Sequence, residues 1–270
     1  MHLSQISILW CLGTLLLSVK GISMQQNFVF ANEKQSDRQA ENIVLIKFRQ
    51  PDTDESSDPR DRPRGGGSRR ICKARPDNSQ VLCTDQQLMA LVPSNHLSDN
   101  DDSSSWGLTL EEKPTLWFYI PYSSKSIHQV FFELFDSDGN KIFLEDTLKF
   151  SGVPGIIGYR PELSKNLEIN KTYRWHLLLR LDPKNPSGDA YISGRIKRIA
   201  IPVNLQNHDH THNPRKLASI LAKAGIWYDT LTILAELSRE DPQYWHSLLQ
   251  SVGLKNLVGE PISTCCTSEQ

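Results

Sequence analysis

The sequence has almost no excess of either charge, since 30 lysine and arginine residues balance 31 aspartate and glutamate residues. Nucleic-acid binding depends on a surplus of cations, so this balance gives no support for a nucleic-acid partner. Beyond the first residues there is also no long apolar run, so no further membrane span is expected. At 270 residues the chain is long enough to build a core of its own, as one large domain or two small ones.

The sequence motifs of common hydrolases are also absent. The sequence has no Gly-x-Ser-x-Gly, no His-Glu-x-x-His and no clear cysteine–histidine pair. The carboxylates of Glu133, Asp136 and Asp138 are close to a predicted turn, where such groups are usually solvated. A scattered triad is recognised only by its geometry, so a hydrolase is kept as a minor alternative. We therefore expect a protein without a recognisable catalytic motif and without a cofactor.

Cysteine is scarce, with five residues in the chain. Cys72 and Cys83 flank a turn-rich insert, and a disulfide that closes this loop is one candidate pairing, because connectivity does not follow from sequence. Their spacing is poor for zinc, and no second pair supplies the remaining ligands. A disulfide would agree with an oxidising compartment outside the cytoplasm.

The first 31 residues resemble an export signal. The stretch from Ile6 to Val19 is mostly apolar and too short for a comfortable transmembrane helix. Val29-Phe30-Ala31 resembles a small-x-small cleavage site. The residues before the apolar stretch include no lysine or arginine, so an uncleaved anchor is the alternative to a cleaved signal. We expect a periplasmic or cell-surface protein.

Residues 32–70 are polar and are interpreted as a disordered linker that ends in an arginine- and glycine-rich arm. In this arm Arg64, Arg69 and Arg70 flank a triple glycine. The arm is either a solvated hinge or a contact for an anion or polymer. It is not a phosphate-binding loop, because no Gly-Lys-Ser/Thr follows it.

Residues 71–203 are predicted to form a β-sandwich of the immunoglobulin or fibronectin type. The central strand lies within Pro114–Tyr122, where both alternating faces are apolar and a proline stands near each end. Leu88–Pro93 is predicted to be an edge strand. Ile127–Asp136 and Lys141–Phe150 are expected to form a hairpin around Asp-Gly, although the same turn resembles a metal loop.

Two further strands, Tyr173–Leu181 and Ala190–Ile199, are predicted to pair. Leu167-x5-Tyr173 resembles a tyrosine corner, in which a phenol ties a loop back to the sheet. The period of two places one set of polar residues on a common outer surface. This surface is either ordinarily solvated or a shallow basic face for an acidic polymer or partner. Its cationic members are Arg174, Arg180, Arg195 and Lys197.

Residues 204–213 are interpreted as a polar linker rich in histidine. His208, His210 and His212 alternate, and an extended chain can chelate a divalent metal with such histidines. No predicted strand fixes them in place, so a solvated linker is the preferred interpretation and the three are weak metal candidates.

Residues 214–260 change to a period of three to four and predict two to three helices in a C-terminal tail. Gly225 and Gly253 end two of them, and Asp241-Pro242 starts the third. The pattern resembles about one tetratricopeptide repeat, which cannot form a stable solenoid alone. These helices are therefore expected to pack on the sandwich or on another protein, with Trp227 and Tyr228 on an interaction surface.

Several blocks together resemble an uncharacterised cyanobacterial family, catalogued as domain of unknown function number 928. The resemblance covers roughly residues 60–260 and implies export and a β domain with a short helical tail. The family carries no assigned activity, so no catalytic or binding residue is transferred. The histidine-rich linker and Cys265-Cys266 depart from the family pattern. The matching blocks are Arg64-Gly65-Gly66-Gly67-Ser68-Arg69, Leu88-x2-Leu91-Val92-Pro93, Pro114–Pro121, Leu167-Glu168-x3-Thr172-Tyr173-x-Trp175, Gly194-x-Ile196-x-Arg198 and Gly225–Asp229.

The sequence thus predicts an exported, non-enzymatic interaction or adaptor module of the cell envelope. The alternative is a protein that binds an envelope polysaccharide or another anionic polymer, using the basic face and aromatics such as Trp106 and Tyr122.

Overall fold

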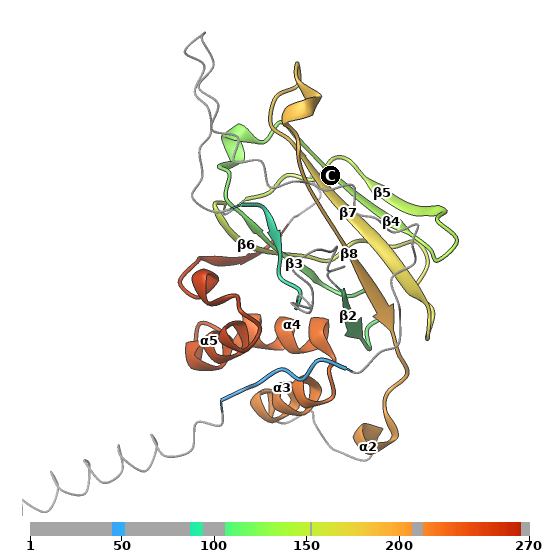
Figure 1. Cartoon of the computed structure of the whole chain (residues 1–270), viewed down its shortest axis with the longest axis vertical. Helices are drawn as coiled ribbons and strands as arrows, with labels where there is room; N and C mark the ends of the chain where they lie inside the picture. The colour runs from blue at the N-terminus through green and yellow to red at the C-terminus, as the bar shows by residue number, and fades with distance from the viewer. Residues whose placement is uncertain (1–44, 52–86, 94–105, 152, 207–212, 266–270) are drawn as a thin grey trace, which may run out of the picture. The chain divides into compact units, whose positions relative to one another are not determined.

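The computed structural model describes residues 45–51, 87–93, 106–151, 153–206 and 213–265 (Figure 1). The strands are β1 (Met89–Ala90), β2 (Trp106–Thr109), β3 (Leu116–Ile120), β4 (Gln129–Phe135), β5 (Lys141–Glu145), β6 (Gly155–Tyr159), β7 (Thr172–Arg180), β8 (Ala190–Arg198) and β9 (Ile262–Thr264). The α-helices are α2 (Val203–Gln206), α3 (Pro214–Lys223), α4 (Trp227–Leu237) and α5 (Pro242–Ser251). Short 3-10 turns lie at Ser124–Ser126, Pro186–Gly188 and Lys255–Leu257.

One sheet has five strands in the order β2-β8-β7-β4-β5. The β2–β8 pair is parallel and the other pairs are antiparallel. Along β7 every second side chain is buried, which is the alternation that the sequence predicts. The predicted hairpin and the pairing of the last two predicted strands are confirmed. The Tyr173 hydroxyl accepts the Glu168 backbone N–H at 3.0 Å, so the expected tie between loop and sheet is present.

The other sheet has four strands in the order β1-β3-β6-β9. The β6–β9 pair is parallel and the other two pairs are antiparallel. Strand β1 stands at one edge, as expected, and β3 is an inner strand with all of its residues buried. Two covered faces explain why β3 is apolar on both sides.

The two sheets and the helices share one hydrophobic core. Between the sheets, the Phe118 ring packs against Trp175 at 5.4 Å and the Phe132 ring against Tyr159 at 5.0 Å. On the opposite face of β3, Trp117 donates its indole N–H to Thr232 of α4 at 3.0 Å. The helices therefore cover the face of the four-stranded sheet that points away from the five-stranded sheet.

The helices α3, α4 and α5 begin and end close to the residues that the sequence predicts. Asn213 caps α3 by accepting the Lys216 backbone N–H, and Gly225 and Gly253 follow α3 and α5 with φ of 75° and 81°. The sequence predicts Asp241 as the N-cap of α5, but its side chain makes no cap hydrogen bond. Its carboxylate instead pairs with the guanidinium of Arg215.

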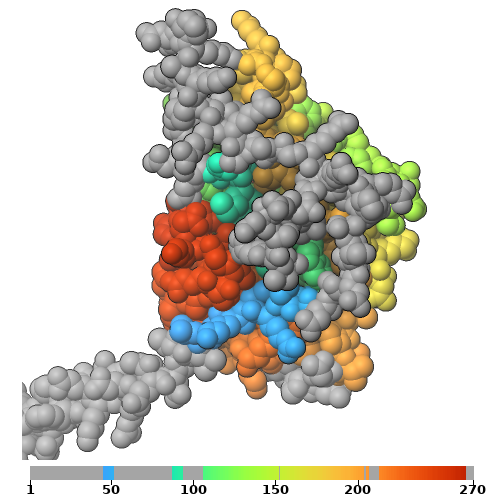
Figure 2. All heavy atoms as spheres, viewed as in Figure 1, coloured from blue at the N-terminus to red at the C-terminus, as the bar shows by residue number. Residues whose placement is uncertain are grey.

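The segment 45–51 packs on the helices, which corrects its assignment to a disordered linker. The Ile46 and Phe48 backbone N–H groups donate to the hydroxyls of Ser247 and Ser251, at 3.1 and 3.2 Å. Ile46 is buried, and the Phe48 ring packs edge-on against Trp227 at 4.8 Å. Figure 2 shows this segment in blue across the helices. Its few apolar residues are enough to hold the segment in place, because the helices offer them a matching apolar surface.

The fold is therefore mostly β, with two mixed sheets and three C-terminal helices. The helices are not an independent tail, because the large apolar side chains of α4 and α5 belong to the common core, and α3 packs through Leu221 in a second cluster with Leu205 and Ile226. Of the two expected arrangements, packing on the sheets is the one that the structure shows. Within the described ranges, none of the helices combines the length and the apolar character that crossing a membrane requires.

Candidate functional site

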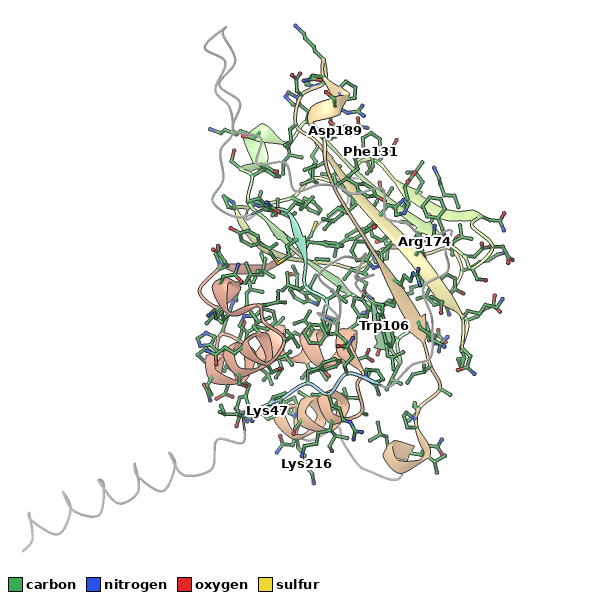
Figure 3. All side chains as sticks on the ribbon, viewed as in Figure 1. Lys47, Trp106, Phe131, Arg174, Asp189 and Lys216 are labelled. Atoms are coloured by element: carbon green, nitrogen blue, oxygen red, sulfur yellow. The ribbon has the colours of Figure 1, made fainter. Side chains whose placement is uncertain are left out.

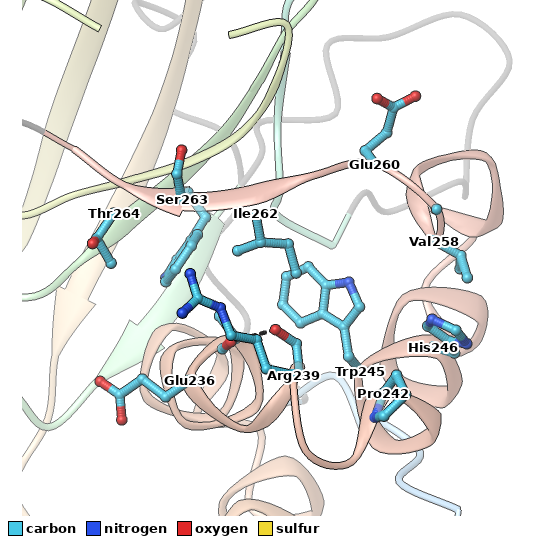
Figure 4. A pocket seen from close by; sticks show the side chains of 14 residues that line it. Glu236, Arg239, Pro242, Trp245, His246, Val258, Glu260, Ile262, Ser263 and Thr264 are labelled. Carbon is cyan, nitrogen blue, oxygen red and sulfur yellow. Dashed lines mark hydrogen bonds between the residues drawn. The ribbon is translucent and has the colours of Figure 1, made fainter. Parts of the chain in front are cut away.

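A groove with a volume of about 640 Å³ lies between β9, the second half of α4, and α5 (Figure 4). We call it the β9 groove. Its floor is aromatic and its rim carries charged and hydroxyl groups. The lining residues are Trp117, Ala235, Glu236, Ser238, Arg239, Pro242, Trp245, His246, Val258, Gly259, Glu260, Ile262, Ser263 and Thr264.

Two tryptophans form the floor of the groove. Trp117 of β3 extends across Gly158 of β6, and a Cβ atom at Gly158 would lie 2.7 Å from the Trp117 ring. Trp245 of α5 meets Trp117 edge-on, with ring centroids 6.4 Å apart. The indole N–H of Trp245 is buried and has no hydrogen-bond acceptor. Buried donors are nearly always paired, so this unpaired N–H is an unusual feature beneath the groove.

The wall of the groove is β9, the last strand of its sheet. In this parallel pair, the Pro261 carbonyl accepts the Ile156 N–H at 2.7 Å, and the Cys265 N–H donates to the Gly158 carbonyl at 2.8 Å. Alternate residues of a strand direct their backbone groups to opposite sides. The N–H and C=O groups of Ile262 and Thr264 therefore point away from β6, toward the side on which β9 pairs with no other described strand.

Charges of both signs lie around the rim. Arg239 and Glu236, at the end of α4, are exposed, and Figure 4 shows the Arg239 guanidinium near the middle of the groove. At the other end, Glu260 is hydrogen-bonded to the Tyr119 hydroxyl. Burial and the Glu260 carboxylate both raise the pKa of Tyr119, so the phenol stays protonated and keeps Glu260 engaged. Arg239 is thus the cation that the groove offers to a ligand.

The model of the family described as Domain of Unknown Function (DUF928) matches residues 64–262. The chain belongs to this family. A comparison with curated proteins finds no match. The DUF928 match contains both aromatic residues of the groove floor and the two helices that line the groove, α4 and α5, and it ends at the first residue of β9. Most of the groove therefore belongs to the DUF928 domain, whereas the lining residues Ser263 and Thr264 lie beyond the match.

Trp227 and Tyr228 do not lie on a surface, which corrects the expectation that they meet a partner. Both are buried at the start of α4. The Trp227 indole donates to the Leu91 carbonyl at 2.8 Å, and the Tyr228 hydroxyl donates to the Arg195 carbonyl at 3.1 Å. These side chains fasten α4 to both sheets, so their role is to hold the helix layer in place.

The predicted outer face of the five-stranded sheet is present. Arg174 lies opposite Arg195, and His176 lies opposite Ser193. Aromatic rings join the cations there, since Phe135 and Tyr191 pack on either side of His176 at 4.8 and 5.4 Å. Burial lowers the pKa of His176 more than Glu133 raises it. Figure 3 shows Phe131 and Arg174 on this sheet.

Much of the charge on this face is already paired. The Arg180 guanidinium bonds to Asp189 at 3.1 Å, and the Lys141 ammonium bonds to Glu133 at 2.6 Å. Arg174, Arg195 and Lys197 also have interaction partners. The outer face therefore offers less unbalanced positive charge than the sequence pattern alone indicates.

Several predicted site residues lie outside the described residues: Arg64, Arg69 and Arg70 of the arm, Cys72 and Cys83, and His208, His210 and His212. Cys265, at the end of β9, is disulfide-bonded. In the described ranges, no group of three or more acidic, histidine or cysteine side chains is placed to hold a metal.

Sequence reasoning did not identify Arg239, Trp245 or Thr264 as site residues. The helical pattern correctly assigns Trp245 to a helix, but it does not show that a strand faces this helix. One usable signal is the short run Pro261-Ile262-Ser263-Thr264, whose β-branched residues after a proline are typical of an edge strand.

Proposed function

We propose that the protein is an exported, non-enzymatic interaction module of the cell envelope, which docks a segment of a partner protein in the β9 groove. The observation that carries the proposal is the combination of an open strand edge, an aromatic floor and a cation in one groove. Strand edges and helix-lined grooves are two common places where proteins receive peptide segments. The volume of about 640 Å³ has room for several side chains.

The groove favours binding rather than chemistry. His246 is the one histidine among its lining residues, and its hydroxyl groups come from Ser238, Ser263 and Thr264. The Ser238 hydroxyl donates to the Ala235 carbonyl, so it is already engaged in ending α4. A nucleophile needs a base within hydrogen-bond reach, and no hydrogen bond joins His246 to these hydroxyls in the described structure.

The proposed location outside the cytoplasm is supported by the disulfide at Cys265, because disulfides persist in oxidising compartments. The finer assignment of the fold is part of the same proposal. Two facing sheets and the Tyr173 tie support an immunoglobulin-like sandwich, and the α4–α5 pair supports tetratricopeptide-like helices.

The test uses point variants, because deletion of residues 214–260 would remove buried core residues such as Trp227 and Trp245. A photoreactive amino acid is placed at His246, inside the groove, and separately at Lys216, an exposed residue on α3. After irradiation of envelope extract, we expect a discrete protein adduct from position 246 and none from position 216. The Arg239→Glu variant should reduce this adduct about tenfold, whereas Lys216→Glu should leave it unchanged.

An equal adduct from both positions, or an adduct unaffected by Arg239→Glu, would contradict docking in the groove. The second candidate function, binding of an anionic envelope polysaccharide, is favoured by the aromatic and cationic outer face of the five-stranded sheet. It predicts retardation in gels that contain cell-wall polysaccharide, and this retardation should disappear when the salt concentration is raised.

A further inference from the structure

We infer that the β9 groove takes its ligand as an added β-strand: an extended peptide pairs with the open edge of β9 and brings an acidic side chain to Arg239. This inference rests on the proposed function and specifies the chemistry of the partner segment. Three features of the groove carry it: the edge of β9, the apolar floor, and the charge of Arg239.

The edge of β9 determines how the ligand pairs. Pro261 and Cys265 are bonded to β6, so the backbone groups of Ile262 and Thr264 face the open side. Thr264 is exposed and Ile262 is half-buried against the groove. An extended peptide gains main-chain hydrogen bonds from such an edge whatever its sequence, and side chains directed into the groove then supply the specificity.

The floor of the groove selects an apolar side chain. Trp117, Trp245 and Ile262 form its apolar part. In a strand, residues two positions apart share one face, so the apolar side chain and the acidic side chain are expected in an acidic-x-apolar pattern.

The charge at Arg239 selects the acidic side chain. Among the described residues Arg239 has no ion-pair partner, whereas Glu260 is engaged with Tyr119. A guanidinium binds a carboxylate in bidentate geometry. Figure 4 shows the Arg239 guanidinium beneath the Ser263–Thr264 part of β9, so a peptide that runs along β9 passes it. We therefore assign the contact to an aspartate or glutamate side chain.

The experiment selects decapeptides from a random displayed library on the immobilised full-length protein. The best peptides are then synthesised with capped ends, and their affinities are measured by fluorescence anisotropy. We expect an acidic-x-apolar pattern, and a loss of about tenfold when the acidic residue is replaced by its amide or when Arg239→Gln is used.

The decisive comparison is Thr264→Pro against Thr264→Val. Proline removes the outward N–H of β9 but leaves the bonds to β6, and an edge strand tolerates proline at such a position. Valine keeps this N–H and has a similar shape. We expect about a tenfold loss of affinity for the proline variant and less than a twofold change for the valine variant.

A readout on the unmodified protein keeps the test independent of variant folding: peptide binding should slow hydrogen exchange at the Ile262 and Thr264 amides. If peptides bind in the groove but leave this exchange and the Thr264→Pro affinity unchanged, strand addition is overturned and the proposed function stands. If peptides bind without an acidic residue, the Arg239 contact is overturned. If no peptide is selected and no adduct forms at His246, both the inference and the proposed function fail.

Discussion

Gly158 controls where the largest side chain of the β9 groove can lie. Because this residue has no side chain, the Trp117 ring rests directly on β6 and reaches toward β9. A glycine inside a strand usually weakens the strand, but here it allows a close approach that no other residue permits. The tight contact also explains why Trp117 can pack with Trp245 and still donate to Thr232.

We predict that Gly158→Ala destabilises the protein by about 1–3 kcal/mol, because the added methyl group would overlap a buried ring that has no room to move. Chemical denaturation at pH 7 measures this change in the free energy of unfolding. Gly259→Ala is the matched control, since a Cβ atom at Gly259 meets no atom within 4 Å. Equal stability of the two variants would show that Trp117 can lie elsewhere at little cost.

Trp227, Tyr228 and Arg239 show what a sequence pattern predicts about a site and what it leaves open. Helical spacing places Trp227 and Tyr228 on α4, but spacing does not distinguish a face that meets this chain's own sheets from one that meets a partner. Both side chains end buried because their polar atoms find backbone carbonyls of the sheets. For Arg239 the error is the opposite one. The sequence shows only an exposed arginine at a helix end, and its place in a groove follows only from the position of β9 beside it.

Among the elements, segment 45–51 has few apolar residues and no regular secondary structure, yet it completes the core. Ile46 is 1% exposed, and Gly225 approaches Pro51 so closely that a Cβ atom there would lie 2.8 Å from its ring. The DUF928 match begins at residue 64 and omits this segment. The folded unit therefore extends beyond the family boundary.

We predict that a chain beginning at residue 52 melts about 5 °C or more below a chain beginning at residue 45, because the truncation exposes Trp227 and leaves Ser247 and Ser251 without their backbone partners. Differential scanning calorimetry gives the two melting temperatures. The full-length protein is measured alongside as the reference. Equal melting of the two truncated chains would mean that the segment contributes no stability.

Periodicity predicts β4, β5, β7, β8 and the three C-terminal helices well, because each of these elements carries its own alternation or apolar stripe. It does not predict β6 or β9. Strand β6 is short and contains two glycines, and β9 has only three residues. Their parallel pairing, like that of β2 with β8, joins parts of the chain that are distant in sequence. No local pattern encodes such a partnership, so the groove that depends on β9 could not be predicted.

For the whole molecule, Asp229 links stability to pH. Its carboxylate, in the first turn of α4, accepts the Leu110 N–H at 3.2 Å and ties the helix to the end of β2. Burial raises its pKa to about 6, although hydrogen bonds from Thr109 and Leu110 oppose this shift. The unfolded chain has the ordinary value of 3.8. The folded state therefore holds the proton more tightly, so this contribution is fully present below about pH 4 and is lost as the pH rises through 6.

We predict that the free energy of unfolding of the wild type falls, relative to Asp229→Asn, by on the order of 3 kcal/mol between pH 4 and pH 7.5. The asparagine keeps the shape and an acceptor oxygen for the Leu110 N–H, but it does not titrate. Urea denaturation of both proteins over this pH range gives the difference. A difference that does not vary with pH would show that the carboxylate has an ordinary pKa in the folded protein.

The contacts of segment 45–51 also have a consequence for the order of folding. Its backbone bonds to Ser247 and Ser251 join residues that are 201 and 203 positions apart. During synthesis, segment 45–51 therefore cannot form these hydrogen bonds until almost the whole folded unit has been made. Contacts that close such long loops form slowly, because the entropy of closure is lost before the contact is gained. A chain that completes its core this late stays unfolded for longer. An unfolded chain can pass through a membrane pore, which agrees with the proposed export.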